Sequence, residues 1–76
     1  MIVKVVQIRD VAIIEMDVAP CADVFIFTIR GREVEMCGKV FELSEELVFR
    51  KGLLILNKSA YFVECEEGTC IAAKTS

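Results

Sequence analysis

Alternation of apolar and polar side chains, which is typical of half-buried β-strands, runs through most of this chain. Residues 2–18 are rich in Val and Ile and predict one long bent strand or two short ones, ended by Pro20-Cys21. Residues 23–29 predict a second strand, with successive side chains on opposite faces. A tight turn at Gly31 then leads into a third strand over residues 33–37.

A helix start is predicted at Ser44, whose hydroxyl can cap the first turn. Glu45 and Glu46 follow it, where the positive end of the helix dipole favours acidic side chains. Gly52 is a typical helix stop. We therefore expect a short helix of about two turns here.

The last part of the chain predicts a fourth strand over residues 53–65, kinked around residues 57–59. Glu67-Gly68 predicts a two-residue hairpin turn into a fifth strand over residues 69–74. The expected fold is a single all-β domain over residues 1–76. It is a small five-stranded OB-like barrel with one short helix between the third and fourth strands.

Two segments, GREVEMCGKVFEL and FRKGLLILNKSAYFVECEEGTCIAAK, resemble the OB-fold of archaeal single-stranded DNA-binding proteins and replication protein A. The resemblance spans Ala22 to Lys74. It rests on the spacing of Gly31, Cys37-Gly38, Gly52, Ser59-Ala60-Tyr61 and Gly68. It implies a partly open five-stranded barrel that binds single-stranded nucleic acid. The strand pattern alone leaves SH3-like and other small folds open.

That family stacks bases on aromatic side chains of its outer face. Of three matching positions only Tyr61 is aromatic, because Cys37 and Cys65 occupy the other two. The nucleic-acid site that the resemblance implies combines this ring with a basic groove made of Arg30, Arg32, Lys39 and Lys58. The alternative is that Tyr61 packs at a barrel edge and the basic residues are solvated turn residues.

The function we expect is therefore a non-catalytic binding module of the single-stranded nucleic-acid type. A protein-interaction or dimerisation subunit is the alternative, and composition is what keeps it open. The net charge of −3 and pI of about 4.9 differ from the basic surface that phosphate binding requires. A chain that is 55% hydrophobic has more apolar residues than so small a core can bury. Its phenylalanines cannot all fit one core; they are Phe25, Phe27, Phe41, Phe49 and Phe62. We expect a homo-oligomer or the interaction subunit of a larger complex, although a monomer with an apolar surface is also open.

The four cysteines are expected to have different structural roles. If Glu67-Gly68 is the hairpin turn, Cys65 and Cys70 face each other at a separation suited to a disulfide, or they remain two free thiols. Cys21 and Cys37 are expected to be small buried hydrophobes. The spacing lacks a CxxC pair and the chain lacks His, so no metal or other cofactor is expected.

The sequence also lacks the groups that catalysis needs. It contains no His, no nucleophile beside a base and no Gly-rich phosphate loop, so we expect a non-catalytic protein.

Lys4 and Arg9 interrupt the opening apolar stretch, so no signal peptide is expected. Pro20 and Asp23 break the longest uncharged run, so no membrane span is expected either, and the predicted location is the cytoplasm. One Gln and one Asn in a chain rich in Glu, Lys and Arg predict a thermophilic source, and the resemblance described above implies an archaeal one.

Overall fold

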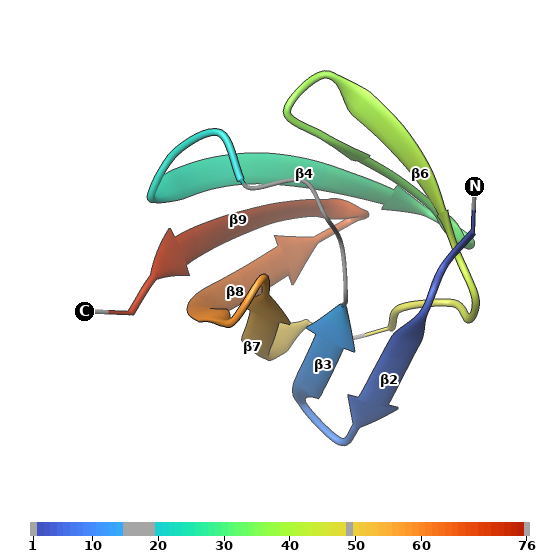
Figure 1. Cartoon of the computed structure of the whole chain (residues 1–76), viewed down its shortest axis with the longest axis horizontal. Helices are drawn as coiled ribbons and strands as arrows, with labels where there is room; N and C mark the ends of the chain where they lie inside the picture. Colours follow the sequence, from blue (N-terminus) through green and yellow to red (C-terminus); the bar gives the residue numbers. More distant parts are fainter. Residues whose placement is uncertain (1, 15–19, 49, 76) are drawn as a thin grey trace.

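The computed structural model describes residues 2–14, 20–48 and 50–75, which form nine strands in one sheet (Figure 1). The strands are β1 (Ile2–Val3), β2 (Val5–Ile8), β3 (Val11–Ile14), β4 (Val24–Arg30), β5 (Glu33–Met36), β6 (Lys39–Leu43), β7 (Lys51–Leu56), β8 (Ser59–Glu66) and β9 (Thr69–Lys74). Their order in the sheet is β1-β6-β5-β4-β9-β8-β7-β3-β2. Only Lys4 separates the two edge strands β1 and β2 in the chain, so the sheet curls into a nearly closed barrel.

Two-residue turns make most of the connections between neighbouring strands. Three of them, at Cys37-Gly38, Asn57-Lys58 and Glu67-Gly68, have positive φ at both residues. This is the type I′ geometry, whose twist matches that of a hairpin. The turns produce two antiparallel three-stranded units, β4-β5-β6 and β7-β8-β9, which join through the pairing of β4 with β9.

The N-terminal segment closes the barrel by pairing with both units. β1 runs parallel to β6, and β3, which pairs with β2, runs parallel to β7. Ser44 lies at the crossing point: its main-chain nitrogen donates to the carbonyl of Val3 at 2.8 Å, and its Oγ accepts from the nitrogen of Val5 at 2.9 Å.

The core fills the barrel with alternate side chains of every strand, as period-two alternation requires. Phe27, Leu43, Leu54 and Leu56 are among its most buried side chains. The ring of Phe25 packs edge-on against Tyr61, with centroids 5.4 Å apart, and it also contacts Phe27. Within the described residues no buried side-chain polar atom lacks a partner.

The all-β barrel agrees with the sequence-based expectation, but the five predicted strands are too few. The stretch 53–65 is the hairpin β7–β8, turned at Asn57-Lys58, and not one kinked strand. Within its described part, residues 2–14, the opening stretch contains three short strands. β6 was not predicted at all, because Cys37-Gly38 is a hairpin turn that leads into it.

The predicted helix over residues 44–52 is also wrong, since none of the described residues there is helical. Ser44 uses its hydroxyl on Val5 instead of on a helix N-terminus. Val48 is held through its main-chain N–H and C=O by the side chain of Gln7, at 3.2 and 2.7 Å. Tertiary hydrogen bonds therefore replace the helical ones that the capping pattern favours locally. In the described part of the chain no helix is long and apolar enough to cross a membrane.

Candidate functional site

The outer surface of five neighbouring strands carries an unbroken row of apolar side chains. From β3 through β7, β8 and β9 to β4, the row passes through the cross-strand partners Val11, Leu53, Phe62, Ala73 and Val24. Beside it, Ile26 on β4 faces Ile71 on β9. We call these seven side chains the apolar face.

Several members of the apolar face are open to solvent. Phe62 and Ile26 are each 62% exposed, Val24 is 57% exposed and Ile71 is 48% exposed. Isolated apolar residues are ordinary on protein surfaces, whereas a contiguous patch of them marks an interaction site. The buried partners Phe25 and Phe27 alternate with Val24 and Ile26, so β4 is apolar on both of its faces.

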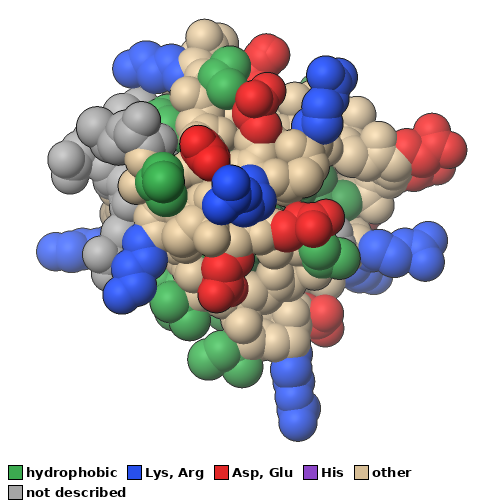
Figure 2. Space-filling model, turned by 90° about the vertical axis from the view of Figure 1, so that its right-hand side faces the viewer, with side chains coloured by type: hydrophobic (Ala, Val, Ile, Leu, Met, Phe, Trp, Pro, Cys, Tyr) green, Lys and Arg blue, Asp and Glu red, His purple; other side chains and the backbone are tan. Residues whose placement is uncertain are grey.

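The outer surface of β5, β6 and the end of β4 is charged in contrast. Its outward side chains include Arg30, Glu33, Glu35 and Glu42, with Val40 as an apolar exception at 60% exposure. Arg32 pairs with Glu42 at 3.0 Å. Figure 2 views the side of the molecule that carries β6, where acidic and basic side chains are interspersed and hydrophobic ones form separate small patches. The outer surface of the barrel therefore has an apolar row across β3, β7, β8, β9 and β4 and a mainly charged surface over β5 and β6.

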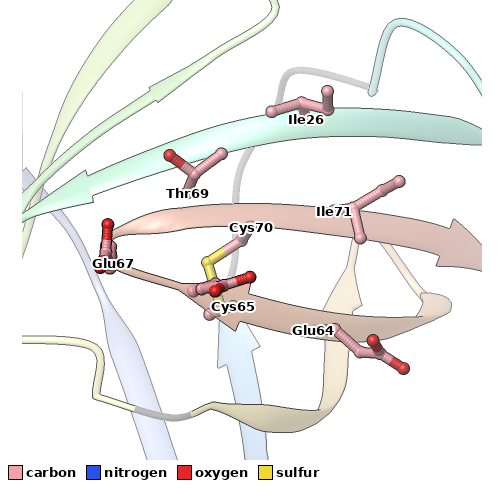
Figure 3. A pocket seen from close by; sticks show the side chains of 8 residues that line it. Ile26, Glu64, Cys65, Glu67, Thr69, Cys70 and Ile71 are labelled. Atoms are coloured by element: carbon pink, nitrogen blue, oxygen red, sulfur yellow. A yellow bond between two sulfur atoms is a disulfide. The ribbon is translucent and has the colours of Figure 1, made fainter.

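A hollow of about 430 Å³ adjoins the apolar face where β4, β9 and β8 lie side by side (Figure 3). Ile26 and Ile71 give it apolar walls, while Glu64, Glu66 and Glu67 line it with carboxylates. Of the described residues that line it, none carries a basic side chain. This combination suits a lysine side chain, whose stem is apolar and whose tip is cationic.

The structure places Tyr61, the predicted stacking residue, in the core. Its side chain points inward on β8 and the residue is only 4% exposed, with its ring against Phe25. A base cannot reach a ring face that is already packed. Its neighbour Phe62, by contrast, lies on the outer surface. From the sequence, Phe62 was named only as one of five phenylalanines that cannot all fit the core. Another of the five, Phe49, lies outside the described residues.

The four predicted basic residues do not form one cluster. Lys58 lies just before the start of β8. Arg30 lies near the other end of this strand, because its neighbour Ile29 donates a main-chain hydrogen bond to the carbonyl of Gly68, which follows β8. The eight residues of β8 would span roughly 24 Å if straight. Arg32 lies just before β5, and Lys39 follows the turn after β5, so these two residues lie at opposite ends of this four-residue strand. Arg32 is moreover paired with Glu42.

Cys65 and Cys70 face each other across β8 and β9, next to the pair Glu66 and Thr69. Their Cα atoms are 4.1 Å apart and a disulfide joins them, with an S–S distance of 2.05 Å. The bond lies on the inner side of the strands, with Cys70 fully buried. It fixes the hairpin that carries Glu64, Glu66 and Glu67.

The expectation that Cys21 and Cys37 are buried hydrophobes is wrong. A disulfide of 2.10 Å joins them, and Cys21 is exposed. The antiparallel pairing of β5 with β4 explains the difference, because Phe27 faces Met36 and Cys37 therefore lies toward the segment that leads into β4. Two disulfides are typical of oxidising compartments or of hyperthermophiles, so the cytoplasmic location and the thermophilic source stay predictions.

Within the described residues no three His, Cys, Asp or Glu side chains are arranged to hold a metal ion. No protein-family model matches the chain, and no curated protein or solved structure matches it. The resemblance to the OB-fold family, and the nucleic-acid binding that it implies, therefore stay predictions.

Proposed function

We propose that this protein is a non-catalytic interaction module that binds another protein surface through its apolar face. The observation that carries the proposal is the continuous row from Val11 to Val24 across five strands, with Phe62 at its centre. Leaving such a patch in water costs about 25 cal/mol for each Å² of apolar surface, and a partner would recover this free energy.

The division of the barrel into two sides supports the same function. Charged side chains on β5 and β6 keep that side solvated, while the apolar face carries an exposed aromatic residue. Exposed aromatic residues at the centre of an apolar patch are typical binding hot spots. Phe62 has this position, with Leu53 and Ala73 as its cross-strand partners.

Binding of single-stranded nucleic acid is the second candidate, and the exposed ring of Phe62 is the observation that favours it. Two features oppose it. The apolar face adjoins Glu64, Glu66 and Glu67, which would repel phosphate, and the chain is acidic overall. The protein interaction is therefore the better-supported function.

The native mass of the protein in extracts of the cells that make it tests this choice. We expect the wild type to migrate in a complex larger than the 8.5 kDa chain, before and after nuclease treatment. Phe62→Ser should release the free chain. Val40→Ser, which removes an equally exposed apolar side chain from the charged side, should leave the complex intact.

Three results would contradict the proposal. A complex that collapses on nuclease treatment would favour the nucleic-acid candidate, and fluorescence anisotropy with labelled single-stranded DNA and RNA would then identify the ligand. A complex that both variants retain would remove the apolar face as the interface. A wild type that migrates as the free chain would leave the face without a partner.

A further inference from the structure

We propose that the partner of the apolar face is a second copy of this chain, docked about a two-fold axis that passes beside Phe62. The inference rests on the proposed function and identifies its partner. A two-fold interface must be self-complementary, since each residue pair occurs twice with the roles exchanged.

One pair of charges at the two ends of β8 has this symmetry, while Glu64 would lie opposite Ala60 of the partner. Lys58 lies four residues before Phe62, and Glu66 lies four residues after it. If two copies of β8 cross antiparallel at Phe62, Lys58 of one protomer lies over Glu66 of its partner, and the reverse pair forms on the other side of the axis. The two Phe62 rings meet at the centre, where aromatic pairs contribute most to an interface.

The hollow beside the apolar face fits the incoming side chain. The aliphatic stem of the partner's Lys58 would lie along Ile26 and Ile71, and its ammonium group would reach Glu64, Glu66 and Glu67. None of the described residues that line the hollow is basic. Glu64 has Lys51 as its cross-strand neighbour on β7, so the carboxylates of Glu66 and Glu67 are the ones best placed for a cation from the partner. The disulfide between Cys65 and Cys70 fixes the hairpin that carries them.

The strands around β8 set the area that a second copy can cover. Because the sheet curls into a barrel, a partner docked at Phe62 meets β7, β8 and β9 first, and the distance from Lys58 to Glu66 is roughly 27 Å along an extended strand. A stable interface buries about 800 Å² on each partner. That area is roughly 15% of the 5245 Å² surface of this chain.

Charge exchange between the two positions tests the register. Sedimentation equilibrium at low salt should give a dimer for the wild type. Lys58→Glu places Glu opposite Glu at both contacts, and Glu66→Lys places Lys opposite Lys, so each variant should weaken self-association at least tenfold. An equimolar mixture of the two variants restores both opposite-charge pairs and should associate about as tightly as the wild type.

Two controls keep the test independent of folding. Position 58 has a positive φ of 68° that Lys and Glu tolerate equally poorly, so Lys58→Glu adds no backbone strain. Glu35→Lys makes the same charge change as Glu66→Lys on the charged side and should leave association unchanged. Rescue in the mixture also shows that both single variants are folded.

Single variants that associate like the wild type, or a mixture without rescue, would overturn this docking. So would a wild type that remains monomeric. These outcomes differ from failure of the proposed function: a purified monomer whose complex in extracts still depends on Phe62 has a different protein as its partner.

Discussion

The side-chain oxygen of Ser44 accepts a hydrogen bond from the main-chain nitrogen of Val5, 2.9 Å away, at the point where the N-terminal segment passes from β1 to β2. Val5 is 4% exposed, so its N–H would be left without a partner if this oxygen were removed. Ser44→Ala is therefore expected to destabilise the fold by about 1–3 kcal/mol. Urea unfolding checks this value. Ser59→Ala, on the β7–β8 hairpin, serves as the matched control, and an equal cost for both variants would contradict a closing role for Ser44.

The same bond explains why the helix could not be predicted correctly. Ser44 followed by two acidic residues is a good capping pattern, and nothing local opposes it. The hydroxyl is used instead by Val5, which lies 39 positions earlier in the chain. Local propensity is a weak guide where a long-range partner competes for the same group.

Gly52 is predicted to be intolerant of any side chain. A Cβ at this position would overlap the carbonyl oxygen of Asp10, which accepts a hydrogen bond of 2.9 Å from the nitrogen of Leu53. Gly52→Ala should therefore cost about 1–3 kcal/mol or more, because the β2–β3 turn must move away from β7.

Gly31→Ala is the control for Gly52. Gly31 has a φ of +62° but open space around its Cβ position, so its substitution should cost only the conformational strain of about 1–2 kcal/mol. Thermal unfolding compares the stability of the two variants. Amide hydrogen exchange should also be faster in β3 and β7 of Gly52→Ala, because the pairing of these two strands is weakened. Normal exchange there would contradict the close approach of Asp10.

The two disulfides predict that denatured protein contains no free thiol unless a reductant is added, and a thiol titration in denaturant checks this. The Cys21–Cys37 bridge closes a 16-residue separation, and the Cys65–Cys70 bridge closes one of 5. Chain entropy assigns about 3 kcal/mol to the longer loop and about 2 kcal/mol to the shorter one.

Replacing each pair with alanines in turn measures these contributions. Under oxidising conditions, Cys21→Ala/Cys37→Ala should have a lower free energy of unfolding than the wild type. In reductant, which opens the Cys65–Cys70 bond of both proteins, the variant should match the wild type. A loss that persists in reductant would assign the effect to packing instead of to the bridge.

Much of the local structure was predictable because it depends on neighbours in the chain. The alternation of Val24 and Ile26 with Phe25 and Phe27 gave the two faces of β4, and Glu67-Gly68 gave the last hairpin. The turn at Asn57-Lys58 was missed because Lys58 adopts a positive φ, a conformation that usually indicates glycine. Because this turn was not recognised, β7 and β8 were predicted as a single strand.

The apolar face could be anticipated only in part. Excess apolar content indicated that some side chains stay exposed, but which ones lie together depends on the pairing of β4 with β9 and of β3 with β7. Those strands are distant in sequence, so no local pattern reports their contact. Tyr61 and Phe62 show the consequence. Successive side chains of a strand point to opposite faces, so the predicted surface ring of Tyr61 is buried and the ring of its neighbour Phe62 is exposed.

Photo-crosslinking from position 62 is the most direct test of the apolar face as a protein interface. Benzoylphenylalanine replaces Phe62 in one variant and Glu35, on the charged side, in another, and both are illuminated in the cells that make the protein. The account predicts a nuclease-resistant protein adduct from position 62 and little from position 35. No adduct from position 62, equal adducts from both positions, or an adduct destroyed by nuclease would contradict it.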